Sequence, residues 1–189
     1  MNNRLSYQSG GLGCRSFLCL SVLCVSLSAY GASNIDPDGA GNRYGWSTNT
    51  GWVDMKGDVA NGVVVTSTCL SGFAWSPNVG WISFGAGPAD GVHYANDSAD
   101  DFGVNKDATG RLWGYAWGAN VGWICLETAG ANGASVCISP YTGLFDGYAW
   151  SPNCGWISFT GLPAYVARTT PWDTLPANPG SVVRFERNY

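Results

Sequence analysis

One short stretch is repeated four times along the chain, and this repetition constrains the fold more than any other feature of the sequence. The clearest copy, residues 147–159, reads Gly-Tyr-Ala-Trp-Ser-Pro-Asn-Cys-Gly-Trp-Ile-Ser-Phe. Residues 72–84 and 114–126 are close copies, and residues 44–55 are a looser one. All four contain Trp-x-x-Asn-x-Gly-Trp, which accounts for eight of the ten tryptophans. Repetition at this scale predicts one supersecondary unit that is used four times.

Each copy has the pattern of a β-hairpin. Tyr148 and Trp150 are two residues apart and therefore share one face of a strand, with Ala149 on the other face. Residues 156–159 alternate in the same way and are rich in side chains that favour strands. The four copies therefore predict four hairpins.

The segment between the two strands of each hairpin predicts a tight loop. Proline restricts φ early in the turn, asparagine bonds its own backbone, and glycine adopts a left-handed conformation without strain. A five-residue loop would place Trp150 opposite Trp156, whereas a four-residue loop would put them on opposite faces, and the sequence leaves both registers open. In either case we expect positive φ at the loop glycines Gly51, Gly80, Gly122 and Gly155.

A short strand precedes each of the three later copies. The pattern predicts these leading strands at residues 62–66, 102–105 and 135–138. Each is followed by a turn and then by an apolar residue two positions before the repeat glycine, namely Leu70, Leu112 or Phe145. The repeat unit is then a three-stranded meander.

The first copy lacks a leading strand, and a spare one occurs near the C-terminus at residues 164–169. This distribution predicts a closed structure in which the last strand completes the first unit and covers a sheet edge. A linear stack capped by that strand is the alternative. The sequence thus predicts an all-β fold of about four meander repeats in one domain, residues 33–173, followed by a tail at residues 174–189.

Residues 1–32 have the pattern of a signal peptide. Arg4 and Arg15 give a basic start, and residues 17–27 are mostly apolar but short for a membrane span. Small residues follow at Ala29, Gly31 and Ala32. We expect cleavage and export to the periplasm, the cell surface or the medium, with no membrane-spanning segment in the mature chain. Retention of the segment as a membrane anchor is the alternative.

The charge of the chain argues against one class of partner. There are nine basic and thirteen acidic side chains, and two of the basic ones lie in the expected signal peptide. Nucleic-acid binding requires a basic face, so we expect no nucleic acid as a partner.

The cysteines predict disulfides in an exported chain. Four follow the expected signal peptide, an even number with three pairings: Cys69, Cys125, Cys137 and Cys154. If the strands that carry Cys125 and Cys137 are antiparallel neighbours, these two residues lie within bonding distance, and Cys69 would pair with Cys154. A zinc site is the weaker alternative, because no Cys-x-x-Cys occurs and His93 is distant in sequence.

No catalytic or metal-binding motif is recognisable, and we expect neither an enzyme nor a cofactor. His93 is the only histidine and has no context that suggests a catalytic triad. The acidic residues Asp54, Glu127 and Asp146 occupy three different places in the repeat, which argues against a shared catalytic role.

An oxygen-rich stretch before the first hairpin has some of the ligands of a calcium site. Asp36, Asp38 and Asn42 offer oxygen ligands, but the distal glutamate of an EF-type loop is missing. We therefore expect an Asp-Gly loop here, and no metal.

The repeat Gly-Tyr-Ala-Trp-Ser-x-Asn-x-Gly-Trp-Ile-x-Phe, with a valine-containing strand and a Thr-Gly turn before it, resembles tandem repeats of uncharacterised secreted bacterial proteins. The resemblance covers most of residues 43–172. Copy one departs from it by losing the alanine and the isoleucine, and copy three has Gly118 and Ala119 in place of Ser-Pro. The resemblance implies a bacterial, exported β-repeat protein and no particular activity.

Two functions fit these observations. The first is a structural or interaction module of the cell surface or matrix, which binds itself or other surface proteins through strand edges. The second is a carbohydrate-binding module in which aromatic rings stack on sugars and amides bond their hydroxyls, using Trp75, Trp81, Trp117, Trp123, Trp150, Trp156, Asn78, Asn120 and Asn153.

The location of the tryptophans separates the two functions. A buried aromatic side chain removes about 150–250 Å² from water at roughly 25 cal/mol per Å², which a small β domain needs for its core. We therefore expect the tryptophans in the core, which favours the first function. Tryptophans exposed in a groove would favour the second.

Overall fold

The computed structural model describes residues 32–127, 135–161 and 165–173. The expected signal peptide, apart from residue 32, and the tail from residue 174 lie outside the described residues. No helix in the described ranges is long and apolar enough to cross a membrane. The described residues form an all-β fold, as predicted, with these strands: β1 Tyr44–Ser47, β2 Gly51–Asp54, β3 Val64–Val65, β4 Cys69–Ser71, β5 Phe73–Ser76, β6 Gly80–Ser83, β7 Val104–Lys106, β8 Leu112–Gly118, β9 Gly122–Cys125, β10 Cys137–Ile138, β11 Phe145–Asp146, β12 Tyr148–Ser151 and β13 Gly155–Ser158.

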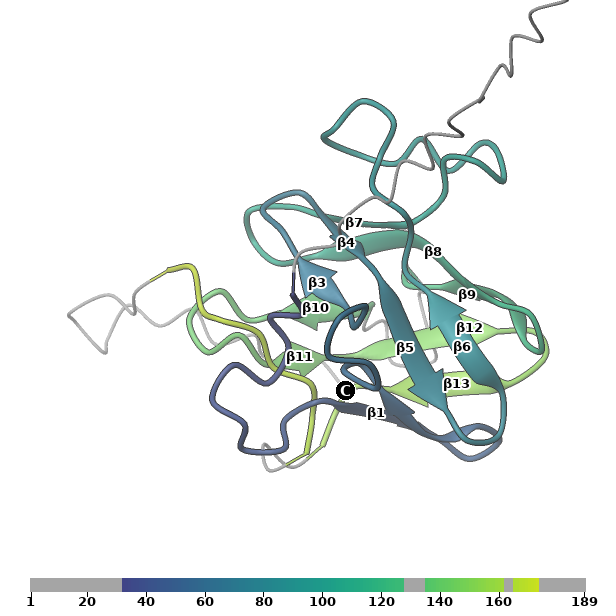
Figure 1. Cartoon of the computed structure of the whole chain (residues 1–189), viewed down its shortest axis with the longest axis horizontal. Helices are drawn as coiled ribbons and strands as arrows, with labels where there is room; N and C mark the ends of the chain where they lie inside the picture. Colours follow the sequence, from purple (N-terminus) through teal and green to yellow (C-terminus); the bar gives the residue numbers. More distant parts are fainter. Residues whose placement is uncertain (1–31, 128–134, 162–164, 174–189) are drawn as a thin grey trace, which may run out of the picture.

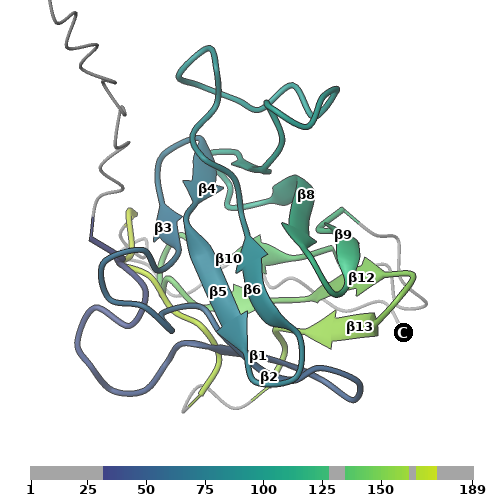
Figure 2. The same ribbon diagram turned by 45° about the vertical axis from the view of Figure 1, so that its right-hand side comes forward.

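Eight strands close into an antiparallel barrel (Figures 1 and 2). Their order is β8-β6-β5-β2-β1-β13-β12-β9, and β9 pairs back with β8. The four sequence repeats are the four hairpins β1–β2, β5–β6, β8–β9 and β12–β13. The first and last hairpins meet where Trp46 of β1 pairs with Ser158 of β13. The predicted closure is confirmed, and the linear stack is wrong.

The C-terminal segment takes the place of the leading strand that the first repeat lacks. Tyr44 forms a parallel bridge with Val166. Ala167 is buried and accepts a hydrogen bond from the N–H of Phe145, as Val136 does from the N–H of Leu112. The last segment therefore completes the first unit, as the sequence predicted.

The middle strand of the meander is one continuous strand, β8, in the third repeat and is divided into two strands in the second and fourth. The first half of β8 pairs with β7 and its second half with β9. Gly114, at φ 93°, lies at the bend between the two halves. The equivalent residues Gly72 and Gly147, at φ 88° and 97°, separate β4 from β5 and β11 from β12. A Cβ at Gly147 would lie 2.2 Å from the carbonyl oxygen of Ser135, so the repeat glycine is required here by close packing as well as by φ.

The barrel interior is filled by small and branched side chains. An eight-stranded barrel is only wide enough for side chains to fill it. Across each hairpin an alanine faces an isoleucine in three repeats, and Gly45 faces Val53 in the first; the alanine–isoleucine pairs are Ala74–Ile82, Ala116–Ile124 and Ala149–Ile157. The void that remains is about 10 Å³ and has apolar walls, which is near the minimum for one water molecule. The interior is therefore a packed core, and a ligand has to bind elsewhere.

Candidate functional site

All eight repeat tryptophans lie on the outer face of the barrel. Within each hairpin the two tryptophans pair directly across the strands, as Trp75 does with Trp81. This is the register of the five-residue loop. The exposed fractions of their side chains run from 38% for Trp75 to 49% for Trp81. The expectation of core tryptophans is wrong, because alanine and isoleucine on the opposite strand faces already fill the narrow barrel.

The loop glycines have the predicted backbone conformation. Gly51, Gly80, Gly122 and Gly155 have φ values of 69°, 78°, 69° and 72°. Four equivalent turns therefore present four equivalent tryptophan pairs around the barrel.

The second tryptophan of each hairpin packs edge-to-face on an aromatic side chain of the first strand. The ring centroids of Tyr44 and Trp52 are 5.7 Å apart with planes at 64°. The same contact recurs as Phe73–Trp81, Tyr115–Trp123 and Tyr148–Trp156, at 6.4, 6.0 and 6.4 Å. We call the eight tryptophans and these four partners, Tyr44, Phe73, Tyr115 and Tyr148, the aromatic belt. The contacts orient each belt tryptophan while leaving nearly half of it exposed.

A small or polar residue of the neighbouring hairpin stands beside each first-strand tryptophan. The pairs are Trp46–Ser158, Trp75–Asp54, Trp117–Ser83 and Trp150–Cys125. Polar atoms from one hairpin are thus interleaved with aromatic rings from the next.

The repeat asparagines join neighbouring turns. Asn78 Nδ2 donates to the carbonyl oxygen of Thr50 at 3.1 Å, in the turn of the preceding hairpin. Asn120 and Asn153 donate in the same way to Val79 and Val121, each at 3.0 Å. Asn49, which the sequence reasoning did not select, donates to Cys154 at 3.0 Å and closes the ring. We call these four bonds the asparagine ring. Since these amides hold neighbouring turns together, their role is structural and they do not belong to the candidate ligand-binding surface.

The four residues that accept these bonds cover the turn end of the barrel. Thr50, Val121 and Cys154 are buried, and Val79 is partly buried against the core. Cys154 is therefore one of four small side chains, one from each turn, that cover the turn end of the barrel. Burial of the thiol raises the pKa of Cys154, and a hydrogen bond with Ser151 opposes this effect.

The expected disulfides are absent, because all four described cysteines are free thiols. Cys69 is buried in β4, on the side of the barrel away from the turn that carries Cys154. The strands of Cys125 and Cys137 are neighbours, as the N–H of Val136 donates to Leu126, but Cys125 points outward beside Trp150 and Cys137 pairs with Asp146 of β11. The structure therefore contains neither of the two predicted disulfides among its described residues.

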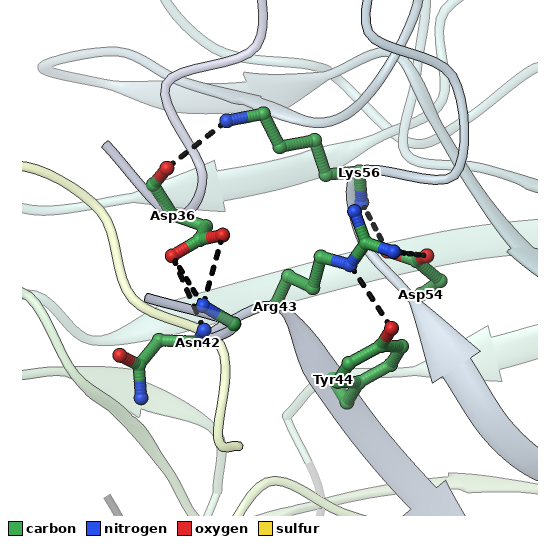
Figure 3. Close-up of polar contacts among 7 residues, drawn as sticks. Asp36, Asn42, Arg43, Tyr44, Asp54 and Lys56 are labelled. Atoms are coloured by element: carbon green, nitrogen blue, oxygen red, sulfur yellow. Dashed lines mark hydrogen bonds and ion pairs between the residues drawn. The ribbon is translucent and has the colours of Figure 1, made fainter. Parts of the chain in front are cut away.

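The polar residues before and along the first hairpin pair with one another (Figure 3). The carboxylate of Asp36, at φ 51°, accepts the N–H groups of Gly41 and Asn42 at 3.1–3.2 Å, which confirms the Asp-Gly loop. Arg43 forms an ion pair with Asp54 at 3.1 Å and donates its Nε–H to Tyr44 Oη at 3.0 Å. Burial raises the pKa of Asp54, and the N–H of Lys56 and the charge of Arg43 lower it in part.

The histidine and the two remaining acidic residues that were candidates for catalysis each have a different partner. The His93 ring packs on Trp113 with centroids 5.4 Å apart. Glu127 forms an ion pair with Arg111, and Asp146 accepts a hydrogen bond from Thr160. Within the described ranges, three or more His, Cys, Asp or Glu side chains do not gather where they could hold a metal ion.

Comparisons of the chain with protein-family models, with curated proteins and with solved structures gave no match, so the function is inferred from the geometry of the belt.

Proposed function

We propose that this protein is a carbohydrate-binding module whose recognition surface is the aromatic belt. The observation that carries the proposal is the exposure of both tryptophans in every repeat, in four directly opposed pairs on the outside of a filled barrel. Contiguous exposed aromatic side chains of this kind mark interaction sites on soluble proteins.

The chemistry of the belt matches the two faces of a sugar. A pyranose ring presents C–H groups on its faces, which pack on the electron-rich face of an aromatic ring, and hydroxyls around its edge. The interleaved polar residues include two groups that can bond such hydroxyls: the half-buried Ser83 hydroxyl, which accepts the N–H of Gly85, and the Asp54 carboxylate, which also pairs with Arg43. A tryptophan with a hydroxyl or carboxylate beside it is therefore a suitable platform for one sugar residue.

The belt is ordered before any ligand arrives. Each second-strand tryptophan is held by its edge-to-face partner, and Trp52 and Trp123 have further contacts with Tyr165 and Phe102, at 5.2 and 5.1 Å. Side chains that are already oriented lose little entropy on binding, which favours affinity.

Four equivalent platforms favour a ligand that repeats. A polysaccharide or a branched glycan can contact two or more platforms at once, and the effective concentration of the second contact raises the overall affinity. We therefore expect weak binding of single sugars to the belt and much stronger binding of long chains.

A second candidate is a surface module that docks other proteins, or further copies of itself, through the same belt. The apolar content of the belt favours it. The closed barrel pairs all eight of its strands on both sides, so this candidate now draws support from the belt and not from strand edges.

A glycan array probed with purified residues 33–189 tests the proposal. We expect the protein to bind oligosaccharides of several residues, and the variant Trp75→Ala/Trp81→Ala to bind them more weakly. Tyr141→Ala is the matched control, because Tyr141 is an exposed aromatic residue outside the belt. A wild-type protein that binds no glycan, and that forms oligomers which the double variant does not, would favour the second candidate instead.

Export belongs to the same proposal, since the polysaccharides of bacterial walls and capsules lie outside the cytoplasm. The motivating observation is the pattern of residues 1–32. Mass spectrometry of the mature protein should find a new N-terminus near residue 33, and the full-length chain in the cytoplasmic fraction would contradict it.

A further inference from the structure

We propose that a recess beside the third hairpin binds one neutral sugar ring, such as the terminal residue of a glycan. The proposal rests on the carbohydrate-binding function and adds to it a second site, which adjoins the belt at Tyr115. The recess has a volume of about 240 Å³ and lies between the segment 85–102 and the strands β8 and β9.

The segment 85–102 is an insertion that occurs before the third hairpin, and its inner part is firmly attached to the core. Asn105, buried in β7, accepts the N–H of Tyr94 at 2.8 Å and donates to its carbonyl oxygen at 3.0 Å. The Tyr94 hydroxyl donates to the carbonyl of Leu70 at 3.0 Å and accepts the N–H of Gly87 at 2.8 Å. The wall that this segment contributes is therefore built from satisfied, buried hydrogen bonds.

The outer part of the insertion is attached to the strand by Asn96. Its Oδ1 accepts the N–H of Gly103 at 2.9 Å, and its backbone has φ 57°. The strand next to it carries Gly114, where a Cβ would lie 2.7 Å from Asn96 Nδ2. The glycine that bends β8 is thus also what lets Asn96 approach the floor of the recess.

The side chains around the recess combine aromatic surface with fixed polar groups. Trp113 and Tyr115 of β8 line one side, and Tyr115 is 40% exposed. Cys125, the cross-strand neighbour of Tyr115 on β9, and Glu127 also line the recess, together with Ala95 and Asn96 of the insertion. Aromatic faces with a few convergent polar groups are the usual composition of a small-molecule site.

The charge of the recess favours a neutral ligand with hydroxyls. The Glu127 carboxylate is paired with Arg111 through Oε1, so the two charges largely cancel and the recess attracts neither anions nor cations strongly. Among the contacts of the described residues, Oε2 of Glu127 is left to accept a hydroxyl hydrogen. A polyol ring that stacks on Trp113 or Tyr115 carries no charge and offers a hydroxyl hydrogen to Oε2 of Glu127.

The volume favours a single ring. It is far larger than one water molecule requires and lies below the range of about 300–1,000 Å³ that is typical of sites for drug-sized ligands. A chain end would fit, with the rest of the chain leaving toward the belt residues Tyr115 and Trp123.

Titration by NMR with four monosaccharide probes tests the site: the methyl glycosides of glucose, galactose, mannose and N-acetylglucosamine. Choline and acetate serve as a cationic and an anionic probe. We expect at least one glycoside to shift the indole signal of Trp113, and neither choline nor acetate to do so. No shift of Trp113 with any glycoside, or a shift with choline alone, would overturn the proposal.

Variants separate this site from the belt. Glu127→Gln should weaken glycoside binding by about tenfold or more, since it removes the charge from a hydrogen bond while keeping the shape. Trp113→Phe should also weaken it, and melting curves of both variants verify folding. The belt variant Trp75→Ala/Trp81→Ala should leave it unchanged.

The two proposals fail in different ways. If long glycans bind through the belt but no glycoside binds the recess, the recess is not a site and the proposed function stands. If a glycoside binds in a Glu127-dependent way but long glycans do not bind, the recess is a site and the belt is not. Glycoside binding that is unaffected by Glu127→Gln and Trp113→Phe would also contradict the recess.

Discussion

The side-chain amide of Asn49 donates to the backbone carbonyl of Cys154 at 3.0 Å, across a sequence separation of 105 residues. This bond joins the turn of the first hairpin to the turn of the last, beside the pairing of β1 with β13 that closes the barrel. It is one of four equivalent bonds. The asparagine that occurs in every copy of the repeat therefore has the same role in each, which is to join the turn of one hairpin to the turn of the preceding hairpin.

The asparagine ring predicts a stability cost for its closing member. Asn49→Ala removes a donor and leaves the Cys154 carbonyl with only a long contact from Ser47 Oγ at 3.5 Å, so we expect a loss of about 0.5–1.5 kcal/mol in the free energy of unfolding. Urea denaturation measures it. Asn61→Ala is the control, because the Asn61 side chain bonds only Asp58 in an exposed loop. Equal effects of the two variants would argue against the ring.

Gly45 predicts a packing conflict inside the barrel. A Cβ at this position would lie 2.9 Å from the ring of Phe159. We expect Gly45→Ala to destabilise the fold by about 1–3 kcal/mol through overpacking, although the other repeats carry alanine here. The second substitution Phe159→Leu should recover part of the loss. A Gly45→Ala protein as stable as the wild type would show that the interior has more room than the structure indicates.

Asp54 predicts a pH dependence with a defined sign. Burial holds its pKa above the ordinary value of 3.8 in the folded state, so the folded protein binds this proton more tightly than the unfolded chain. The stabilisation that this proton provides is fully present below the unfolded pKa and is lost as the pH rises through the folded pKa. Relative to Asp54→Asn, the wild type should therefore gain stability as the pH falls from 7 toward 4.

NMR titration of the carboxyl carbons gives an internal comparison for this prediction. The hydrogen bond from Asn61 lowers the pKa of Asp58, so Asp54 should titrate at a higher pH than Asp58. The reverse order would contradict the assignment of a buried carboxylate to Asp54.

The free thiols predict insensitivity to reductant and selective alkylation. The melting temperature of the oxidised protein should equal that of the reduced protein. Iodoacetamide should modify Cys125 and Cys137 in the folded protein, while Cys69 and Cys154, which are 5% and 3% exposed, should react only on unfolding. Peptide mapping without reductant checks this, and a Cys125–Cys137 bridge would restore the disulfide prediction.

The hairpins could be predicted from the sequence because they depend on local signals. The closure could be predicted because one repeat unit is divided between the two ends of the chain. The glycines before the second tryptophans give the turns, and alternation along four-residue strands gives the two faces. The spare strand predicted at residues 164–169, with no hairpin after it, indicates closure, because a repeat unit divided between the two ends of the chain is completed only in a ring.

The sequence could not predict which face of each strand points into the barrel, because the alternation of side chains treats the two faces alike. It places Trp150 and Ala149 on opposite sides without saying which side is inside. Burial energy argues for the larger side chain inside, but the interior of this barrel is already filled by the alanine and isoleucine pairs together with Phe84 and Phe159. The recess at Glu127 could not be predicted either. It is formed partly by the insertion, and no local sequence pattern predicts how that segment packs over β8.

The most direct test of the aromatic belt follows the indole N–H signals of the protein by NMR during titration with an oligosaccharide selected on the array. Trp172 is the reference, because it is 38% exposed, like Trp75, but lies outside the belt, with its indole N–H donating to the Ala108 carbonyl at 3.2 Å. We predict that signals of belt tryptophans shift with ligand concentration while the signal of Trp172 stays in place. Saturable binding that leaves all eight belt indoles unshifted would contradict the proposal that the belt is the glycan-binding surface.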